Sequence, residues 1–238
     1  MTEPIARFLA QYVPKVYLAT EVSDAKDILV SYDKVYQYKK IATEEVQSDL
    51  KIRLIYELSN NKTSYIQGFF ESIGFPEISG HEVPKLRGDW DNIMQEEFIL
   101  LAPFTSQWEE KKRNWGYEKF IILSELLEKE YNIKCVLLKD HHSFKEMMSL
   151  IKHCKFFVGN DSGPAIIAQS LDKVSFVIFG AVEPKYIHLS NNTTPIYDKN
   201  RHKLCQHSTR VEEISCCEEF CMDRIRVDEV LGIIKKQI

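Results

Sequence analysis

Hydrophobic positions in the second half of the chain follow two alternating patterns. Short runs of consecutive apolar residues, which are typical of strands buried on both faces, occupy residues 97–102, 134–138, 156–158 and 174–179. Apolar residues at helical spacing occupy residues 117–130 and 144–153, the segment after 163, and residues 227–236. Strands that alternate with helices in this way predict an α/β domain built on a parallel sheet.

The first half repeats this alternation with less regularity. Helical spacing is found at residues 2–12, 23–30 and 64–73, and strand-like runs at residues 16–19, 34–38 and 54–58. Residues 75–91 contain glycines and prolines without clear periodicity, so they are predicted to be a linker. We therefore expect an α/β domain with its linker at residues 1–93, a second α/β domain at 94–226, and a terminal helix at 227–238.

A polar turn, Gly-Asn-Asp-Ser-Gly at residues 159–163, separates a predicted strand from a predicted helix. Gly159 and Gly163 allow the backbone to turn tightly and to approach a ligand, while Asp161 or Ser162 can cap the helix. Free N–H groups at the start of that helix would then favour an anion such as a sugar phosphate. The same residues are also ordinary turn chemistry, so a capped helix without a ligand is the alternative.

Composition narrows the functional classes. The chain has 238 residues, 44% hydrophobic and 28% charged, with a net charge of −4, which is typical of a soluble globular protein and gives no general attraction to nucleic acid. Basic clusters at 111–113 and 199–203 could still hold an anion. No apolar run approaches the roughly 20 residues that span a bilayer, and no signal-peptide pattern is present, so a cytoplasmic location is expected. His141 and His142 are expected to be exposed in a loop, with lining of the site as the alternative.

Four of the six cysteines lie near the C-terminus, at Cys205, Cys216, Cys217 and Cys221. In a cytosolic protein such clustering suggests a structural zinc or iron site, to which His202 or His207 could contribute. A C-x-x-C pair is absent, since Cys205-Gln-His-Ser208 stands in that place. Reduced, packed thiols are therefore the alternative to a metal.

Several spaced motifs together resemble glycosyltransferase family 9, which includes the bacterial heptosyltransferases of lipopolysaccharide synthesis. Residues 158–180 are similar to the family's strand, Gly-Asn-Asp-Ser-Gly-Pro turn, helix and apolar strand ending in Phe-Gly. Residues 100–106, 113–115 and 117–120 resemble its strand, proline-containing loop, basic-x-Trp and helix, and residues 221–230 its closing segment. The resemblance covers most of residues 97–238 in the right order, and residues 1–90 only loosely.

This resemblance implies a GT-B fold of two Rossmann-like parallel-sheet domains. The C-terminal half would hold a nucleotide-sugar and the N-terminal half the acceptor. The family's first strand and its Gly-Asp loop, which supplies a catalytic base, have no counterpart before Thr2, so the N-terminal domain is expected to be incomplete and no catalytic residue is assigned. Ile166 stands where the family commonly carries a histidine that can bind the ligand.

The resemblance also implies which residues contact the donor. The hydroxyls of Thr105 and Ser106 would bind phosphate, and Lys112 or Arg113 would offset the negative charge on the departing diphosphate. The turn between the strand and the helix would form the rest of the site. The implied donor-binding residues are Thr105, Ser106, Lys112, Arg113, Gly159, Asn160, Asp161, Ser162 and Gly163.

The expected function is therefore transfer of a sugar, heptose from ADP-heptose, onto a lipopolysaccharide or another cell-surface glycan. The reaction needs no redox cofactor, the resemblance implies no essential catalytic metal, and peripheral contact with the inner membrane is compatible with it. From the net charge and the lack of a long apolar run we expect no nucleic-acid partner and no transmembrane segment. A catalytically inactive nucleotide-sugar-binding or scaffold protein derived from such an enzyme is the main alternative. A metal-binding interaction module, which rests on the cysteines alone, is a third hypothesis.

Overall fold

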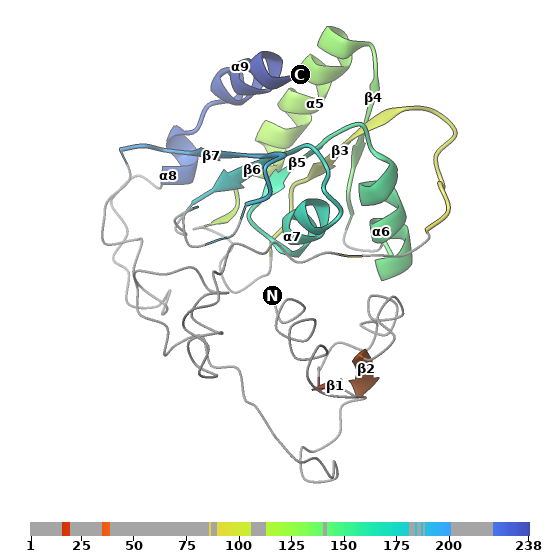
Figure 1. Cartoon of the computed structure of the whole chain (residues 1–238). Helices are drawn as coiled ribbons and strands as arrows, with labels where there is room; N and C mark the ends of the chain where they lie inside the picture. Colours follow the sequence, from red (N-terminus) through yellow and green to blue (C-terminus); the bar gives the residue numbers. More distant parts are fainter. Residues whose placement is uncertain are drawn as a thin grey trace. The chain divides into compact units, whose positions relative to one another are not determined.

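The computed structural model of the chain describes residues 16–19, 35–38, 86, 90–105, 113–139, 142–180, 184, 187, 189–200 and 221–238 (Figure 1). The chain divides into two compact units. Unit 1 comprises Met1–Asp89 with Tyr186–His188, and unit 2 comprises Trp90–Lys185 with Leu189–Ile238. The helix predicted at residues 227–238 lies within unit 2. The predicted three-part division itself stays a prediction.

In unit 1 the structure describes two strands that form a parallel pair. These are β1 (Val16–Ala19) and β2 (Val35–Tyr38), with Val16 opposite Val35 and Ala19 opposite Tyr38. Both strands were predicted, and their parallel pairing requires a crossover connection between them. The helix predicted at residues 23–30 and the other elements predicted between residues 2 and 73 lie outside the described residues, as does most of the predicted linker.

Unit 2 is built on one sheet of five parallel strands in the order β4-β3-β5-β6-β7. The strands are β3 (Phe98–Ala102), β4 (Lys134–Leu137), β5 (Phe157–Asn160), β6 (Ser175–Phe179) and β7 (Thr193–Tyr197). The hydrophobic pattern predicted the first four, and the structure confirms them within a residue or two of their expected ends. The parallel sheet is confirmed as well.

The fifth strand, β7, was not predicted, because no apolar run marks it in the sequence after residue 179. Only Ile196 is buried in this strand, which also contains Pro195. β7 pairs with β6 alone and so forms an edge of the sheet. An edge strand tolerates proline and buries few side chains, and for this reason no continuous apolar run marks it in the sequence.

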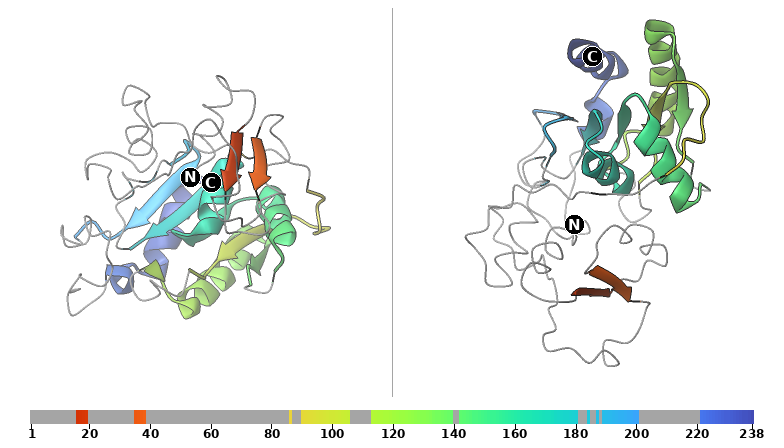
Figure 2. Two further views of the ribbon diagram at one scale, coloured as in Figure 1. Left: turned by 90° about the horizontal axis from the view of Figure 1, so that it is seen from below. Right: turned by 45° about the vertical axis from the view of Figure 1, so that its right-hand side comes forward.

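Helices cover both faces of this sheet (Figures 1 and 2). One face carries α5 (Tyr117–Tyr131) and α9 (Val227–Gln237), with the short α8 (Cys221–Arg224) leading into α9. The other face carries α6 (Phe144–His153) and α7 (Gly163–Ser170). The helices predicted in this half of the chain are therefore confirmed.

The core lies on both sides of the sheet because the inner strands bury all their residues. Toward α5 and α9, the buried cluster includes Ile99, Leu101, Phe156, Val158, Phe176, Phe120, Leu123, Leu127, Val230 and Ile234. Residues at the alternate strand positions, such as Leu100, Phe157 and Val177, face the other layer and are fully buried too. Each such side chain contributes about 1.5–3 kcal/mol on burial, which explains why β3, β5 and β6 are apolar throughout.

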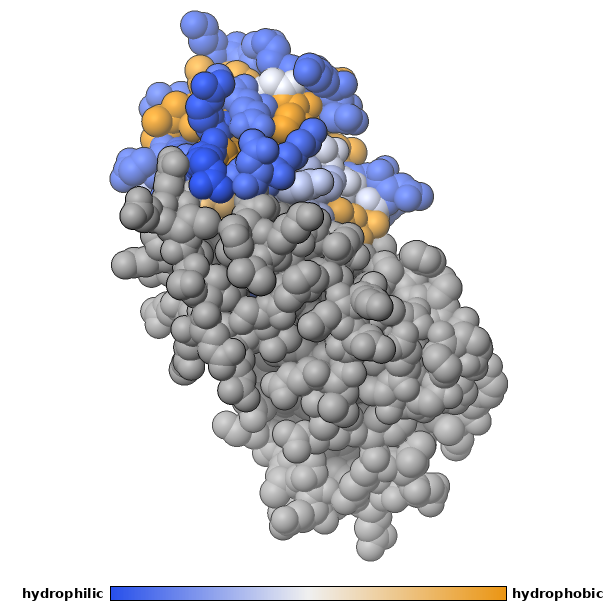
Figure 3. Space-filling model, turned by 90° about the vertical axis from the view of Figure 1, so that its left-hand side faces the viewer, coloured by the Kyte–Doolittle hydropathy of each residue, from blue (hydrophilic) through white to orange (hydrophobic). Residues whose placement is uncertain are grey.

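On the face shown in Figure 3, the surface of the described part of unit 2 is mainly hydrophilic, with hydrophobic residues interspersed. Large hydrophobic side chains that remain exposed include Ile122 and Leu126 on α5 and Ile238 at the C-terminus. None of the helices in the described part of the chain combines the length and the apolar character that a membrane crossing requires.

Gly159 lies at the end of β5 directly opposite Ala102 of β3. A Cβ atom at this position would come within 2.6 Å of Cζ of Phe157 and 3.0 Å of Cβ of Ala102. Both neighbours are buried in the core, so neither can move aside freely. Packing between the two strands therefore accounts for a glycine at this position.

Gly159→Ala is expected to lower the free energy of unfolding by about 1–3 kcal/mol, because the added methyl group overpacks the contact between β3 and β5. Urea unfolding followed by circular dichroism measures the change. Gly232→Ala in α9 is the matched control, since a Cβ there would meet no atom within 4 Å. The control should be neutral or stabilising by up to about 1 kcal/mol. Equal stability of the two variants would contradict the packing argument.

Candidate functional site

The candidate site lies where the order of strands in unit 2 reverses. β3 is the first strand of the sheet along the chain, and the next two strands, β4 and β5, pair with it on opposite sides. The connections that leave β3 and β5 therefore diverge to opposite faces of the sheet, which leaves a crevice at the carboxyl ends of these strands. In open α/β sheets this crevice is the usual position of a bound ligand.

A pocket of about 240 Å³ occupies this crevice. Its lining comes from the segments that follow β3 and β4, from the start of α7, and from one residue of α6. The lining residues are Ala102, Phe104, Thr105, Leu138, Lys139, His142, Met147, Ser162, Gly163 and Pro164. Three of the nine predicted donor-binding residues, Thr105, Ser162 and Gly163, thus line this pocket from separate parts of the chain.

The pocket combines an apolar lining with a few polar groups. Phe104, Leu138 and Met147 supply large apolar side chains, whereas Thr105 and Lys139 supply a hydroxyl and a positive charge. The Oγ1 atom of Thr105 is buried and has no hydrogen-bond partner among the residues that the structure describes. Such a lining suits a ligand with one flat, apolar part and one anionic part.

Sequence reasoning missed most of the apolar lining. Phe104, Leu138 and Met147 carry no motif of their own and look like ordinary core residues in the sequence. His142 was expected to be an exposed loop histidine, with lining of the site as the alternative, and the structure supports the alternative. The signal that points to this region is position alone, because residues 138–142 follow directly after β4 at the carboxyl edge of the sheet.

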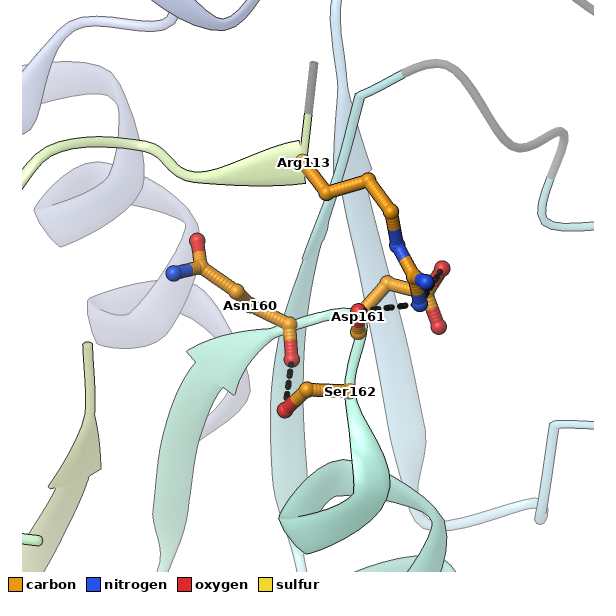
Figure 4. Close-up of polar contacts among 4 residues, drawn as sticks. All are labelled: Arg113, Asn160, Asp161 and Ser162. Atoms are coloured by element: carbon orange, nitrogen blue, oxygen red, sulfur yellow. Dashed lines mark hydrogen bonds and ion pairs between the residues drawn. The ribbon is translucent and has the colours of Figure 1, made fainter. Parts of the chain in front are cut away.

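The polar turn after β5 is fixed by an ion pair (Figure 4). Nη2 of Arg113 lies 2.9 Å from Oδ2 of Asp161 and also donates to the backbone carbonyl of Asp161. The Asp161 side chain is only 5% exposed, and that of Arg113 is 22% exposed. A carboxylate with so little access to water requires a cation nearby, so this pair fixes both residues at the edge of the site.

Ser162 is the N-cap residue of α7, but neither it nor Asp161 caps the helix through its side chain. The Ser162 hydroxyl instead donates to the carbonyl of Asn160 at 3.1 Å, and the Asp161 carboxylate pairs with Arg113 (Figure 4). The expectation of a side-chain cap is therefore wrong. Because Pro164 has no N–H, Gly163 and Ala165 carry the first N–H groups of α7, and Ser162 leaves them available to a ligand.

Gly163 is placed differently from Gly159. A Cβ at Gly163 would meet no atom within 4 Å, and the residue lines the pocket. The fold therefore has room for a side chain at this position, but the side chain would occupy space beside the pocket. A glycine here keeps the first turn of α7 open to close approach by a ligand.

Asn160 is fully buried and its amide is used within the protein. Nδ2 donates to the carbonyl of Pro103 at 2.7 Å, and Oδ1 accepts from the backbone N–H of Trp115 at 3.1 Å. In Figure 4 the amide points away from the Arg113–Asp161 pair. The structure thus gives the Asn160 amide two partners within the protein, and the donor contact that the sequence suggested stays a prediction.

Trp115 and Lys119 tie the segment that carries Arg113 to the C-terminal helices. The buried indole Nε1 of Trp115 donates to the carbonyl of Ile225 at 2.8 Å. Nζ of Lys119 donates to the carbonyls of Met222 at 3.0 Å and Asp223 at 3.1 Å. Burial lowers the pKa of Lys119, and the negative charge of Asp223 opposes that shift. The positions of residues 113–116 therefore depend on the turn between α8 and α9.

The remaining predicted site residues fall outside the described part of the chain or away from the pocket. Ser106, Lys112, Cys205, Cys216 and Cys217 lie outside the described residues. Cys221 begins α8 and is half-buried. Within the described residues no group of three or more His, Cys, Asp or Glu side chains is placed to hold a metal ion.

Two further cysteines are described in unit 2, and both belong to its core. Burial raises the pKa of the Cys135 and Cys154 thiols to about 12, so both stay protonated at neutral pH. A protonated thiol is a poor metal ligand. Neither cysteine contributes to the predicted metal site.

Comparison with known proteins gives consistent matches. Residues 114–215 match the model of glycosyltransferase family 9 (heptosyltransferase). Lipopolysaccharide heptosyltransferase 1 of Campylobacter coli is 27% identical over 94 residues, which make up 40% of this chain and 26% of that relative. The matched stretch thus spans about a quarter of the length of this curated relative.

Solved structures show the same fold at low sequence identity. The iron-containing dodecameric glycosyltransferase TibC from enterotoxigenic E. coli H10407 aligns with a TM-score of 0.74 and 12% identity, over 98% of this chain and 71% of TibC. TibC has also been solved in complex with ADP-D-beta-D-heptose, and that structure aligns with a TM-score of 0.73 and 14% identity, over 98% of this chain and 70% of that one. A glycosyl transferase family 9 structure from Veillonella parvula aligns with a TM-score of 0.66 and 10% identity, over 99% of this chain and 92% of that one.

The predicted fold class is confirmed by the parallel α/β sheet and by these neighbours, which are of the GT-B type. The family model covers α5, β4, the polar turn and α7, whereas residues 100–106 and 221–230, which also carry the predicted resemblance, lie outside the matched range. The resemblance is therefore confirmed, in that residues 114–215 match the model of glycosyltransferase family 9.

Proposed function

We propose that unit 2 binds a nucleoside-diphosphate sugar in the pocket at the ends of β3 and β5, and that the chain is a glycosyltransferase of the heptosyltransferase type. The observation that carries this proposal is the combination of an apolar pocket with the open N-terminus of α7. Gly163 and Ser162 form part of that pocket, next to the Arg113–Asp161 pair. A nucleotide diphosphate matches both parts of this lining.

Within this proposal each part of the donor has a complementary surface. The base and ribose would contact Phe104, Leu138 and Met147, which line the apolar part of the pocket. The diphosphate would lie against the first turn of α7, where N–H groups and the helix dipole favour negative charge. Thr105 and Lys139 would supply a hydroxyl and a positive charge to the same anion. Ser106 and Lys112 stay predicted donor contacts.

The proposed reaction is direct transfer of the sugar. A hydroxyl oxygen of the acceptor forms a bond to the anomeric carbon, the bond from that carbon to the diphosphate oxygen breaks, and the nucleoside diphosphate leaves with the electron pair. A cation near the leaving diphosphate stabilises the charge that develops on it. Lys139, which lines the pocket, and Arg113, held beside Asp161 at the edge of the site, are the described residues that we propose for this role. The hydroxyl proton requires a base, and we assign none.

ADP-heptose is the donor that we propose, with a lipopolysaccharide or another cell-surface glycan as acceptor. TibC, which shares the fold, has been solved with ADP-D-beta-D-heptose, and the Campylobacter coli relative is a lipopolysaccharide heptosyltransferase. Both comparisons support the choice of donor. The acceptor is proposed from the relative alone.

The alternative is a protein that binds a nucleotide-sugar without transferring it. Ile166 favours this alternative, because its hydrocarbon side chain lies on α7 three residues after Gly163 and cannot bind the ligand through a hydrogen bond. Binding and transfer must therefore be measured separately.

Isothermal titration calorimetry with ADP and with ADP-heptose is expected to show one site per chain, and incubation with ADP-heptose and heptose-deficient lipopolysaccharide is expected to release ADP. GDP serves as the control ligand, since its base differs while its diphosphate does not. Binding without ADP release would favour the binding-protein alternative. Absence of binding by both ADP and ADP-heptose would refute the site.

Gly163→Ala is expected to weaken ADP affinity at least about tenfold, because the new methyl group obstructs the first turn of α7, while stability changes by less than about 1 kcal/mol. Calorimetry gives the affinity and thermal unfolding gives the stability. Gly232→Ala in α9 is the matched control, because it makes the same change in a helix away from the pocket. Unchanged ADP affinity in Gly163→Ala would show that the diphosphate does not lie against this turn.

The predicted metal site at Cys205, Cys216, Cys217 and Cys221 is proposed as a second, independent feature. TibC contains iron, which supports iron over zinc, and thiolate ligands suit either metal. Elemental analysis of the purified protein is expected to find about one metal ion per chain, and Cys221→Ser should lower that content. Metal well below stoichiometric amounts in the unmodified protein would favour packed, reduced thiols.

A further inference from the structure

Three chain segments meet at the side chain of Asn160. One is the exit of β3 at Pro103, the second is the segment Arg113–Gly116, and the third is the turn that begins with Asn160 itself. The amide of Asn160 bonds to the carbonyl of Pro103 at 2.7 Å and to the N–H of Trp115 at 3.1 Å. Asn160 is fully buried, so water does not compete for these bonds.

We infer that Asn160 is a positioning residue for the donor: its buried amide holds the segments that carry Thr105, Arg113 and Asp161 in register without itself touching the ligand. This inference rests on the proposed function of the same site. It assigns Asn160 a different role from the donor contact implied by the family resemblance.

The spacing along the chain makes this role direct. Thr105 lies two residues after Pro103, Arg113 lies two residues before Trp115, and Asp161 follows Asn160 immediately. These three residues proposed to act at the site are therefore each within two residues of an atom bonded to the amide, or of Asn160 itself. Removal of the amide would break its bonds to Pro103 and Trp115 and would leave the Arg113–Asp161 pair to hold the second segment to the third.

A second amide completes the junction. Oδ1 of Asn114 accepts from the N–H of Gly116 at 3.0 Å and lies 3.3 Å from Nδ2 of Asn160. The two asparagines differ in what they supply, because Asn160 must both donate and accept, whereas Asn114 is seen only to accept. This difference gives a sharp test by isosteric substitution.

Asn160→Asp retains the size of the side chain, but the new side chain can donate a hydrogen bond only when its carboxyl is protonated, which depends on pH. A protonated carboxyl can donate to the carbonyl of Pro103 and accept from the N–H of Trp115, whereas a carboxylate can only accept. Burial raises the pKa of this carboxyl and Asp161 adds to that shift, while Arg113 opposes it. The described β3 exit, Pro103 to Thr105, has no titratable side chain. The junction should therefore form at low pH and be lost as pH rises through the raised pKa.

The measurement is ADP affinity by calorimetry at about pH 5 and about pH 8, with circular dichroism to verify the folded state. Asn160→Asp is expected to bind within about threefold of the unmodified protein at the lower pH and at least about tenfold more weakly at the higher pH. Asn114→Asp is the matched control, since its carboxylate still accepts both bonds. It should follow the unmodified protein at both pH values.

The possible outcomes separate this inference from a purely structural role and from failure of the proposed function. If folded Asn160→Asp binds ADP at the higher pH as tightly as the unmodified protein does, the inference is overturned and Asn160 is a stabilising residue only. If Asn160→Asp unfolds at the higher pH, Asn160→Ala is measured at neutral pH instead. Asn160→Ala is expected to bind ADP at least about tenfold more weakly than the unmodified protein, and unchanged ADP affinity would overturn the inference. If the unmodified protein does not bind ADP, the proposed function fails and the inference fails with it.

Discussion

Burial of both faces of the five-stranded sheet is the constraint on which the rest of unit 2 depends. Residues of β3, β5 and β6 are buried whichever way they point, so these strands can carry almost no polar side chains along their length. Polar chemistry is left to the strand ends, where the chain leaves the sheet. The reversal of strand order then determines where a ligand can bind, because the connections that leave β3 and β5 diverge to opposite faces and leave a crevice at the carboxyl ends of these strands.

This constraint also explains what the sequence could reveal of the fold. The runs at β3, β5 and β6 are read easily because burial on both faces demands uninterrupted apolar residues, whereas β4 lies at the other edge of the sheet and was recognised from its apolar residues although only Cys135 is buried there. β7 carries Pro195 and one buried residue, Ile196, so it has no comparable signature. The extended conformation of β7 depends on its pairing with β6, and that pairing exists only when the sheet has formed.

The candidate site was predictable only in part for a related reason. Gly163, Asp161 and Ser162 stand in one short turn, whose residue types fit either a ligand site or a plain capped helix, and the family resemblance favoured the ligand. Phe104, Leu138 and Met147 come from three separate segments and have ordinary apolar identities, so only the fold brings them to one pocket. Asn160 shows the opposite case, in which a residue inside the motif turns its amide into the protein. A motif locates a site along the chain, but the partners of each side chain depend on residues far away in sequence.

The low exposure of the Arg113–Asp161 pair has a consequence for how the site responds to ionic strength. Mobile ions screen charges that lie in water, and they reach a carboxylate that is 5% exposed only weakly. Added salt should thus leave the shape of the turn after β5 unchanged. Any dependence of ligand affinity on salt would then report the charge of the ligand itself, and would not indicate rearrangement of the protein that receives it.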